Sequence, residues 1–363
     1  MAKRVSVDKW LFGVTLLLVL IGLVMVFSAS AVIAKDRFGS PYYFMLRQTA
    51  WAFAGVIAMF IMIRVDYRKL QHPAIVYSLI SVTTLLLISA LFLDRSHNTH
   101  RWIKLGVLSF QPSELAKPAI ILYLAYFLST RLKQIDDWRR TLIPAVIPTL
   151  LFTLLIVRQP DLGTAMACCA ITGAVLWVAG MHPKYLGYAL AASILPLYIL
   201  IFRTPWRYQR ILAFMDPYAD PQGSGFHMIQ SLIAVGTGGV TGKGLMEGKQ
   251  KLFYLPEPQT DFIYAVIAEE WGLIGSIIIV LLFAFFCYRG LRCAMNTRDS
   301  FARFLAVGIT AMVGVQAFFN ISVVLGLLPT KGIPLPLISY GGSSLFITLA
   351  SVGVLLNITK QTD

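Results

Sequence analysis

Charged residues are scarce in this chain. Asp, Glu, Lys and Arg make up 13% of its 363 residues, whereas about 25% is usual in a soluble domain. Cysteine is rarer still: Cys168 and Cys169 lie within one apolar run, and Cys287 and Cys293 lie around the end of another. These positions predict neither a disulfide framework nor a metal site. The composition therefore excludes a soluble protein.

Long apolar runs take the place of the missing charge. Hydrophobic residues make up 57% of the chain and the mean hydropathy is +0.73. Runs of about 20 residues are long enough to cross a hydrocarbon core, and in lipid only a helix satisfies the backbone of such a run. The first run contains Ala29-Ser30-Ala31, which resembles a signal-peptidase site, but its length and the runs that follow indicate an uncleaved helix. We expect an all-α integral membrane protein, with residues 1–363 as a single polytopic domain and ten transmembrane helices at about 10–34, 48–63, 73–93, 115–129, 142–157, 163–180, 185–202, 262–288, 304–328 and 340–358.

The 31 basic residues outnumber the 17 acidic ones. They lie in the gaps between apolar runs, which favours orientation signals and anionic lipid over a nucleic-acid partner. The short basic loops 64–69, 131–140 and 289–303 predict that both termini are cytoplasmic. The opposite, extracytoplasmic face then carries irregular segments at about 94–114 and 329–339, and a large loop at about 203–261 between the seventh and eighth helices. Because irregular backbone at a membrane persists where it lines a cavity, we expect the functional site on this face.

The large external loop ends in Thr260-Asp261, after which apolar residues continue without a break. Thr is a good N-cap, so we expect a helix that begins near Thr260 and places Asp261 in its first turn. There the helix dipole would stabilise the anionic carboxylate. An ionised carboxylate beside an acceptor hydroxyl can abstract its proton, so Asp261 is a candidate general base. The alternative is a purely structural first-turn acid.

Glu269 and Glu270 follow on the same predicted helix, with Glu269 about 12 Å deeper than Asp261. An unpaired charge at that depth costs at least several kcal/mol. The two glutamates therefore either face a polar interior with partners or are protonated. Alternatively, the helix begins later and both lie in an interfacial layer.

A second set of polar residues surrounds the start of the fourth span. Glu114 and Lys117 have i, i+3 spacing and can form an ion pair on one helix face. This pair either only holds helices together or contributes Lys117 to an anion pocket. Because Arg and Lys neutralise phosphate, the external face fits an anionic, phosphate-bearing substrate delivered from the membrane. The candidate substrate-binding residues are Arg101, Glu114, Lys117, Asp161, Arg210, Lys243 and Lys331.

Two weaker patterns are set aside. Gly236–Gly244 is glycine-rich like a phosphate loop, but it has Thr237 and Gly244 where the Walker spacing needs Gly and Ser or Thr. Its glycines more plausibly allow tight turns and close backbone approach. His97 and His100 lie three apart without a neighbouring Cys or acid cluster, so no metal site is predicted there.

Several long motifs follow one another along nearly the whole chain. They are Arg101-Trp-Ile-Lys-Leu-Gly with Phe110-Gln-Pro-Ser-Glu-Leu-Ala-Lys117, Arg158-Gln-Pro-Asp-Leu-Gly-Thr164, Asp216–Ser231 leading to Leu255-Pro-Glu-Pro-Gln-Thr-Asp-Phe262, and Leu328–Ser344. In sequence and in order, these motifs resemble those of the SEDS family of shape, elongation, division and sporulation proteins (FtsW, RodA and SpoVE).

This resemblance implies a ten-helix bacterial glycosyltransferase in the cytoplasmic membrane that polymerises lipid II into β-1,4 glycan strands at the outer face. It implies a class B penicillin-binding protein as partner, together with other membrane proteins of the divisome or elongasome, and no certain cofactor, although a divalent cation is left open. The key acid of the family matches Asp261, and Arg101, Glu114, Lys117 and Arg210 match positions of its central cavity and external loops. Gln259 replaces a His that is frequent in the family. Pro329–Gly332 and Lys251–Glu257 resemble the division-type branch, which works at the septum, more than the elongation-type branch.

Two other functions remain open from the residues alone. A lipid-precursor flippase would use Glu114, Lys117, Glu269 and Glu270 along a translocation path, although no inverted repeat is visible between the two halves. A non-catalytic assembly scaffold would use the same polar face to bind proteins only.

Overall fold

The computed structural model describes residues 7–93, 100–105, 108–135, 137–252 and 254–361, and most of these residues are helical. Eight of the described helices are long and apolar enough to cross a membrane, which confirms the predicted all-α membrane protein. All ten predicted ranges fall on helices. The two outside the set of eight are α6, which is shorter, and α4, which carries Glu114 and Lys117 among its first turns.

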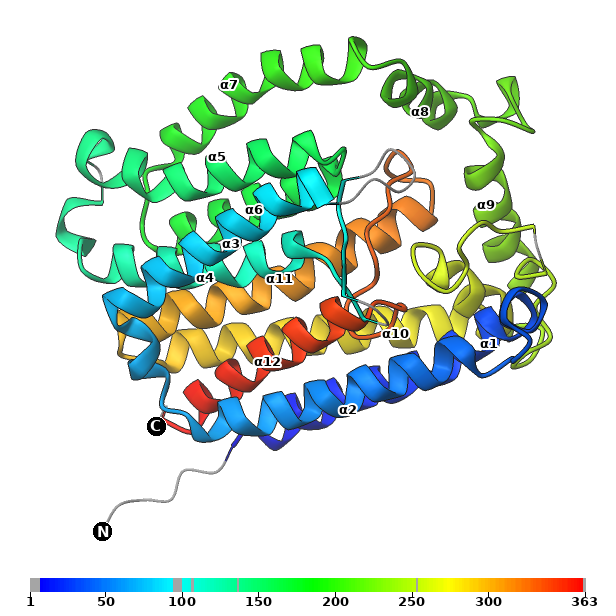
Figure 1. Ribbon diagram of the computed structural model, residues 1–363, viewed down its shortest axis with the longest axis horizontal. Helices are drawn as coiled ribbons and strands as arrows, with labels where there is room; N and C mark the ends of the chain where they lie inside the picture. The colour runs from blue at the N-terminus through cyan, green and yellow to red at the C-terminus, as the bar shows by residue number, and fades with distance from the viewer. Residues whose placement is uncertain (1–6, 94–99, 106–107, 136, 253, 362–363) are drawn as a thin grey trace.

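Within the described ranges, twelve α-helices and one short hairpin follow one another along the chain (Figure 1). The hairpin pairs β1 (Ile103–Leu105) with β2 (Leu108–Phe110) in antiparallel register. The helices are α1 (Lys9–Phe38), α2 (Tyr43–Arg64), α3 (Pro73–Leu93), α4 (Pro112–Ser129), α5 (Ile143–Arg158), α6 (Leu162–Val178), α7 (Pro183–Phe202), α8 (Pro205–Met215), α9 (Phe226–Gly238), α10 (Ile263–Asn296), α11 (Ser300–Val324) and α12 (Gly342–Thr359).

The membrane-spanning helices form a bundle around a buried apolar core to which α4, α11 and α12 contribute heavily. Helix α12 packs closely along α2, where small residues let the two backbones approach. A Cβ atom added at Gly353 would lie 2.6 Å from the carbonyl oxygen of Met59, so only glycine fits there. Helix α7 differs from the other spans because it has no buried residue, and Figure 1 shows it set off from the rest of the bundle.

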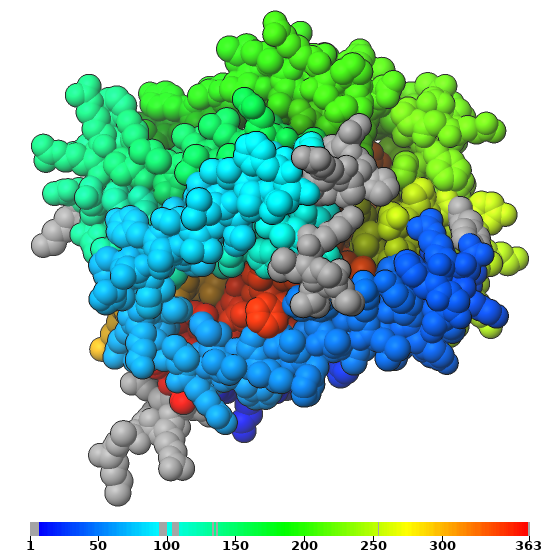
Figure 2. All heavy atoms as spheres, in the orientation of Figure 1, coloured from blue at the N-terminus to red at the C-terminus, as the bar shows by residue number. Residues whose placement is uncertain are grey.

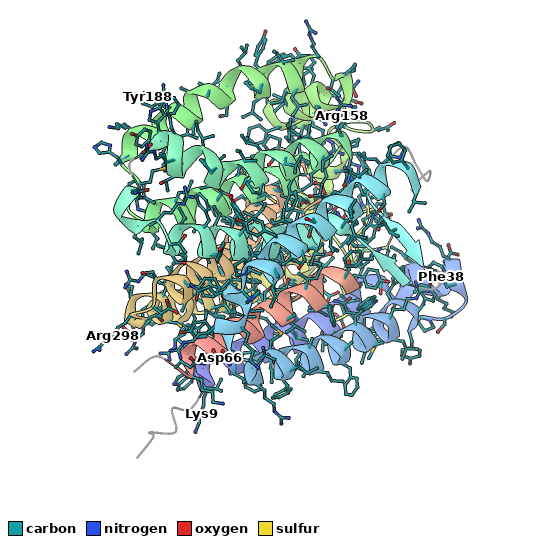
Figure 3. The ribbon with its side chains drawn as sticks, turned by 60° about the vertical axis from the view of Figure 1, so that its left-hand side comes forward. Lys9, Phe38, Asp66, Arg158, Tyr188 and Arg298 are labelled. Atoms are coloured by element: carbon teal, nitrogen blue, oxygen red, sulfur yellow. The ribbon has the colours of Figure 1, made fainter. Side chains whose placement is uncertain are left out.

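The two ends of the bundle differ in character. The described stretches near both termini lie at one end, where Figure 3 also shows Lys9, Asp66 and Arg298. Helices α8 and α9 lie at the other end, to which Phe38 and Arg158 also point. Termini at one end are what an even number of spans requires. The large loop predicted at 203–261 contains two helices, α8 and α9.

Candidate active site

A cavity of about 640 Å³ opens at the end of the bundle that carries the irregular segments. Its walls come from α2, the β-hairpin, the start of α4, residues 260–261 and the segment 332–344. Figure 2 shows residues of α12 in a recess between α2 and α3. The cavity brings together four charged side chains, those of Arg47, Arg101, Glu114 and Asp261.

The backbone around Asp261 is held by the segment that precedes α12. Tyr340 N donates to the carbonyl oxygen of Gln259 (2.8 Å), and Ser339 Oγ donates to that of Thr260 (2.5 Å). On the other side, a Cβ atom at Gly332 would lie 2.7 Å from Asp261 Oδ2. The absence of a side chain at Gly332 therefore lets this segment approach the carboxylate.

The predicted helix start is wrong by two to three residues. Helix α10 begins at Ile263, Phe262 is its N-cap, and no side chain caps it. Thr260 does not cap the helix because its hydroxyl donates to the carbonyl oxygen of Glu257 (3.2 Å) in a preceding turn. Asp261 is therefore not a first-turn acid, and the helix dipole does not set its charge in the way we expected.

The electrostatic environment of Asp261 favours a carboxylate that titrates near neutrality. Burial, together with the nearby carboxylates of Glu257 and Asp161, raises the pKa of Asp261 to about 7 against the opposing effect of Arg101 and Arg210. The side chain is half-buried and lines the cavity. A group with this pKa can both accept and release a proton near neutral pH, as general acid–base catalysis requires.

Glu114 and Lys117 form the predicted ion pair. Lys117 Nζ lies 2.8 Å from Glu114 Oε2, and both side chains are almost fully buried. Glu114 lines the cavity, whereas Lys117 is not part of its lining. The positive charge of Lys117 is matched by its neighbour, which favours the structural interpretation of this pair over the anion pocket.

Asp161 caps helix α6. Its carboxylate accepts hydrogen bonds from Thr164 N (3.1 Å), Thr164 Oγ1 (2.8 Å) and Gln111 Nε2 (3.4 Å), and the residue is 4% exposed. Arg101, which lies just before the hairpin, donates to the carbonyl oxygens of Gln159 and Pro160 in the turn that precedes α6. The structure thus brings Asp161 near the site as a supporting residue whose charge acts on Asp261.

Lys243 lies in a different cluster from Asp261. Its Nζ atom pairs with Glu269 Oε1 at 2.9 Å, and Lys251 Nζ pairs with Glu270 Oε1 at 2.5 Å. Ser28 Oγ on α1 also donates to Glu270 (2.6 Å). Both glutamates are fully buried, so the expectation of a polar interior with partners is confirmed.

Helix α10 breaks at Gly272, which has φ 66° and ψ −161°. The break frees two carbonyl groups and two N–H groups, and the glycine-rich loop after α9 pairs all four. Lys243 N and Gly244 N donate to the carbonyl oxygens of Glu269 (3.0 Å) and Glu270 (3.1 Å), while Leu273 N and Ile274 N donate to those of Gly239 (2.9 Å) and Val240 (3.2 Å). A Cβ at Gly242 would lie 2.1 Å from the Glu270 carbonyl oxygen, which confirms the expected close backbone approach.

Three further cations lie near Asp261. Arg210 Nη1 donates to the carbonyl oxygen of Thr330 (3.4 Å), so α8 reaches the segment before Gly332. Lys331 Nζ contacts Met166 Sδ at 2.6 Å. Arg207, which the sequence motifs do not single out, is 9% exposed and donates to the carbonyl oxygen of Leu200 (3.2 Å).

Asn320 is a site residue that the sequence analysis missed. It is 2% exposed near the C-terminal end of α11, and its Nδ2 atom donates to the carbonyl oxygens of Asp261 (2.8 Å) and Ile333 (2.7 Å). An amide inside an apolar run is a detectable signal, because a buried amide needs hydrogen-bond partners. Within the described ranges no group of three or more His, Cys, Asp or Glu could hold a metal ion, and His97 lies outside these ranges.

The fold defines a polytopic membrane protein whose helix bundle has, at one end, a cavity lined by charged side chains that include Asp261. The chain belongs to the FtsW/RodA/SpoVE family of cell cycle proteins, whose family model matches residues 8–363. It is 42% identical to the probable peptidoglycan glycosyltransferase FtsW of Geobacter metallireducens over 344 residues, which cover 94% of this chain and 91% of that protein. It is 43% identical to stage V sporulation protein E of Bacillus subtilis over 361 residues, 99% of each chain.

Solved structures agree with this assignment. One chain of a peptidoglycan synthase complex that coordinates polymerization and crosslinking superposes with a TM-score of 0.81 at 32% identity, covering 98% of each chain. The rod shape determining protein RodA of Thermus thermophilus superposes with a TM-score of 0.72 at 28% identity, also over 98% of each chain. The identities to FtsW and to the sporulation protein exceed that to RodA, in keeping with the expected resemblance to the FtsW branch.

Proposed function

We propose that this protein is a peptidoglycan glycosyltransferase that polymerises lipid II into β-1,4 glycan strands at the outer face of the cytoplasmic membrane. The single observation that carries the proposal is Asp261, a half-buried carboxylate that lines the 640 Å³ cavity with its pKa raised to about 7. The relatives named as peptidoglycan glycosyltransferases support the reaction class.

In the proposed reaction, Asp261 accepts the proton from the GlcNAc 4-hydroxyl of one lipid II. The oxygen attacks the MurNAc anomeric carbon of the growing chain and forms the β-1,4 bond. The bond from that carbon to the diphosphate breaks at the same time, and its electron pair leaves with undecaprenyl pyrophosphate. The single displacement inverts the α-linked donor and needs one base and a stabilised leaving group, without a covalent enzyme intermediate.

Positive side chains near Asp261 would stabilise the charge that develops on the leaving group. Arg101 and Arg210 suit this role because both act electrostatically on Asp261. Lys117 and Lys243 are less suited, since each pairs with a buried glutamate. We infer that fewer cations are available to bind the leaving group than the sequence motifs indicate.

A lipid II polymerisation assay tests the proposal directly. We expect the full-length protein, purified with a class B penicillin-binding protein, to form glycan polymer from fluorescent lipid II in detergent. The Asp261→Asn variant should form none while retaining its fold and its partner. Normal polymerisation by this variant would refute the assignment of the base. Absence of polymer from the wild-type complex with an active partner would favour the flippase alternative.

The partner and the location are also part of this proposal. The similarity to a chain of a peptidoglycan synthase complex supports association with a class B penicillin-binding protein. The relatives named FtsW support work at the division septum alongside other divisome proteins. A labelled full-length chain should accumulate at midcell during division, and uniform distribution over the lateral wall would instead support an elongation role.

A further inference from the structure

Several cations at this end of the bundle differ in whether a carboxylate neutralises them. Lys117, Lys243 and Lys251 each lie within 2.9 Å of a glutamate oxygen. Within the part of the chain that the structure describes, no carboxylate oxygen lies within 4.0 Å of Arg207, Arg210 or Lys331. Three uncompensated positive charges therefore remain on the α8 side of Asp261.

These three side chains occupy one place in the fold. Arg207 and Arg210 are three residues apart on α8, and both guanidinium groups lie over the ring of Trp206, at 4.8 Å and 5.1 Å. The hydrogen bond from Arg210 to Thr330 connects α8 to Lys331. The next residue, Gly332, packs against the carboxylate of Asp261. The group thus lies beside the base, but it is not part of the lining of the 640 Å³ cavity.

Arg207 has an unused donor in this group. It is 9% exposed, and its Nε atom has no hydrogen-bond partner among the residues that the structure describes. A buried charged donor without an acceptor is costly, so such an arrangement is typical of a site that a ligand completes. Burial, together with the neighbouring Arg210 and Arg207, lowers the pKa of Lys331 to about 8 against the opposing effect of Asp161. An anion among these side chains would relieve the repulsion between them.

We propose that Arg207, Arg210 and Lys331 form the site of the diphosphate leaving group, which assigns a binding role to Arg207. This inference rests on the proposed glycosyl transfer. A diphosphate esterified at both ends carries two negative charges. When the anomeric carbon–oxygen bond breaks, the electron pair stays on the diphosphate oxygen and adds a third. A site with three unpaired cations is therefore better matched to the leaving group than to the bound donor, as transition-state stabilisation requires.

Product inhibition measures this site in the working complex. We expect undecaprenyl pyrophosphate to inhibit polymerisation by the wild-type protein, and the concentration for half-inhibition to rise about tenfold in Arg207→Gln, since a charge-assisted contact is lost. Arg210→Gln should show a similar rise, and because Arg210 is exposed this variant should fold normally. Arg203→Gln is the matched control: Arg203 is exposed at the end of α7, so its inhibition curve should match that of the wild type. Unchanged inhibition in both Arg207→Gln and Arg210→Gln would overturn the proposal.

Direct binding to an inactive protein separates this inference from the reaction itself. In full-length Asp261→Asn, undecaprenyl pyrophosphate should change the fluorescence of Trp206, since both arginines lie over its ring. The signal should disappear when Trp206→Phe is added and should shift to about tenfold higher ligand concentration when Arg207→Gln is added. Binding that is unaffected by Arg207→Gln would refute the site and leave the role of Asp261 intact. Polymerisation by Asp261→Asn would instead refute the proposed base.

Three probes distinguish the source of the anion. Undecaprenyl pyrophosphate, undecaprenyl monophosphate and inorganic pyrophosphate are added separately to the Asp261→Asn protein. We expect the lipid diphosphate to bind most tightly, and inorganic pyrophosphate to bind more weakly with the same dependence on Arg207. Equal binding of the monophosphate and the diphosphate would contradict a diphosphate site.

Discussion

The buried amide of Asn320 on α11 holds the backbone of Asp261, which lies in the turn before α10. Asn320 Nδ2 donates to the carbonyl oxygen of Asp261 at 2.8 Å and to that of Ile333 at 2.7 Å. The same side chain thus fixes the residue that carries the carboxylate and the segment that packs against it. The position of Asp261 therefore depends on a side chain of another helix.

Replacing Asn320 should separate catalysis from stability. Asn320→Leu leaves two carbonyl groups without their donor, at a cost of about 1–3 kcal/mol for each group. We expect a lower melting temperature and a fall in kcat of about tenfold or more, with a smaller change in KM. The measurements are thermal unfolding in detergent and lipid II polymerisation at several substrate concentrations.

Asn357→Leu is the matched control for this prediction. Asn357 is 3% exposed, donates to the carbonyl oxygen of Ile63 (2.8 Å) and accepts from Tyr67 N (3.0 Å), far from the cavity. It should lower the melting temperature by a similar amount and leave kcat near that of the wild type. Equal loss of kcat in both variants would show that Asn320 acts through general stability alone.

The pH dependence of the rate should report Asp261. Its pKa is about 7, so the fraction of the basic form falls about tenfold for each pH unit below that value. We expect kcat/KM, which reports the pKa of the free enzyme, to decline from about pH 7 downward. A rate that stays constant to pH 5 would contradict the proposed base.

Stability should change with pH in the opposite sense. The pKa of Asp261 is about 7 in the folded state, whereas the ordinary pKa of an aspartate is 3.8. Between these two pH values the folded state therefore binds more protons than the unfolded state. Its stability therefore falls as the pH rises through this range. Thermal unfolding of the wild type and of Asp261→Asn across pH 4.5–8 should show a decline in the wild type that the variant partly loses. Parallel curves for the two proteins would show that Asp261 is not the group responsible.

The apolar runs predicted the ten helical ranges because membrane helices are defined by local hydrophobicity and length. The break at Gly272 could not be predicted in the same way. Its freed backbone groups are paired by a loop about 30 residues earlier in the chain, and a single Gly within an apolar run does not reveal that partner. The helix α10 begins later than the sequence predicted for a similar reason. The hydroxyl of Thr260 donates to Glu257, and the carbonyl oxygen of Thr260 accepts from Ser339.

The sequence placed Asp261 at the external end of the bundle, where it lines the cavity, whereas two of the predicted substrate-binding cations, Lys117 and Lys243, are paired with glutamates. Asp261 stood out because a carboxylate before a membrane span is unusual. The sequence showed where positive charges lie, but their pairing depends on tertiary contacts. Lys251 shares Glu270 with Ser28, which is 242 residues from that glutamate along the chain. Such pairings decide which cations remain free for an anion, and only the fold reveals them.

Gly332 should tolerate no side chain. In Gly332→Ala the new Cβ would lie 2.7 Å from Asp261 Oδ2, so the carboxylate or the segment must shift. We expect kcat to fall about tenfold while the melting temperature changes little, because Gly332 is exposed to the cavity. Gly173→Ala is the control, since nothing lies within 4 Å of a Cβ at that position in α6. Activity of Gly332→Ala equal to that of the control would show that the close approach has no catalytic role.

The buried pair of Lys251 and Glu270 should behave as a unit. Lys251→Met leaves the Glu270 carboxylate buried with its hydrogen bonds from Ser28 and Met246 but without its counter-charge. Breaking a buried pair by removing one partner costs about 3–5 kcal/mol, so we expect a large drop in melting temperature. Adding Glu270→Gln to Lys251→Met removes the uncompensated charge and should restore much of the lost stability.

The ion pair of Arg140 and Asp137 at the surface is the control. Arg140→Met, alone or with Asp137→Asn, should change the free energy of unfolding by less than about 1 kcal/mol, because surface pairs contribute little. A double variant at Lys251 and Glu270 that is less stable than Lys251→Met alone would show that the carboxylate stabilises the helix break independently of the lysine.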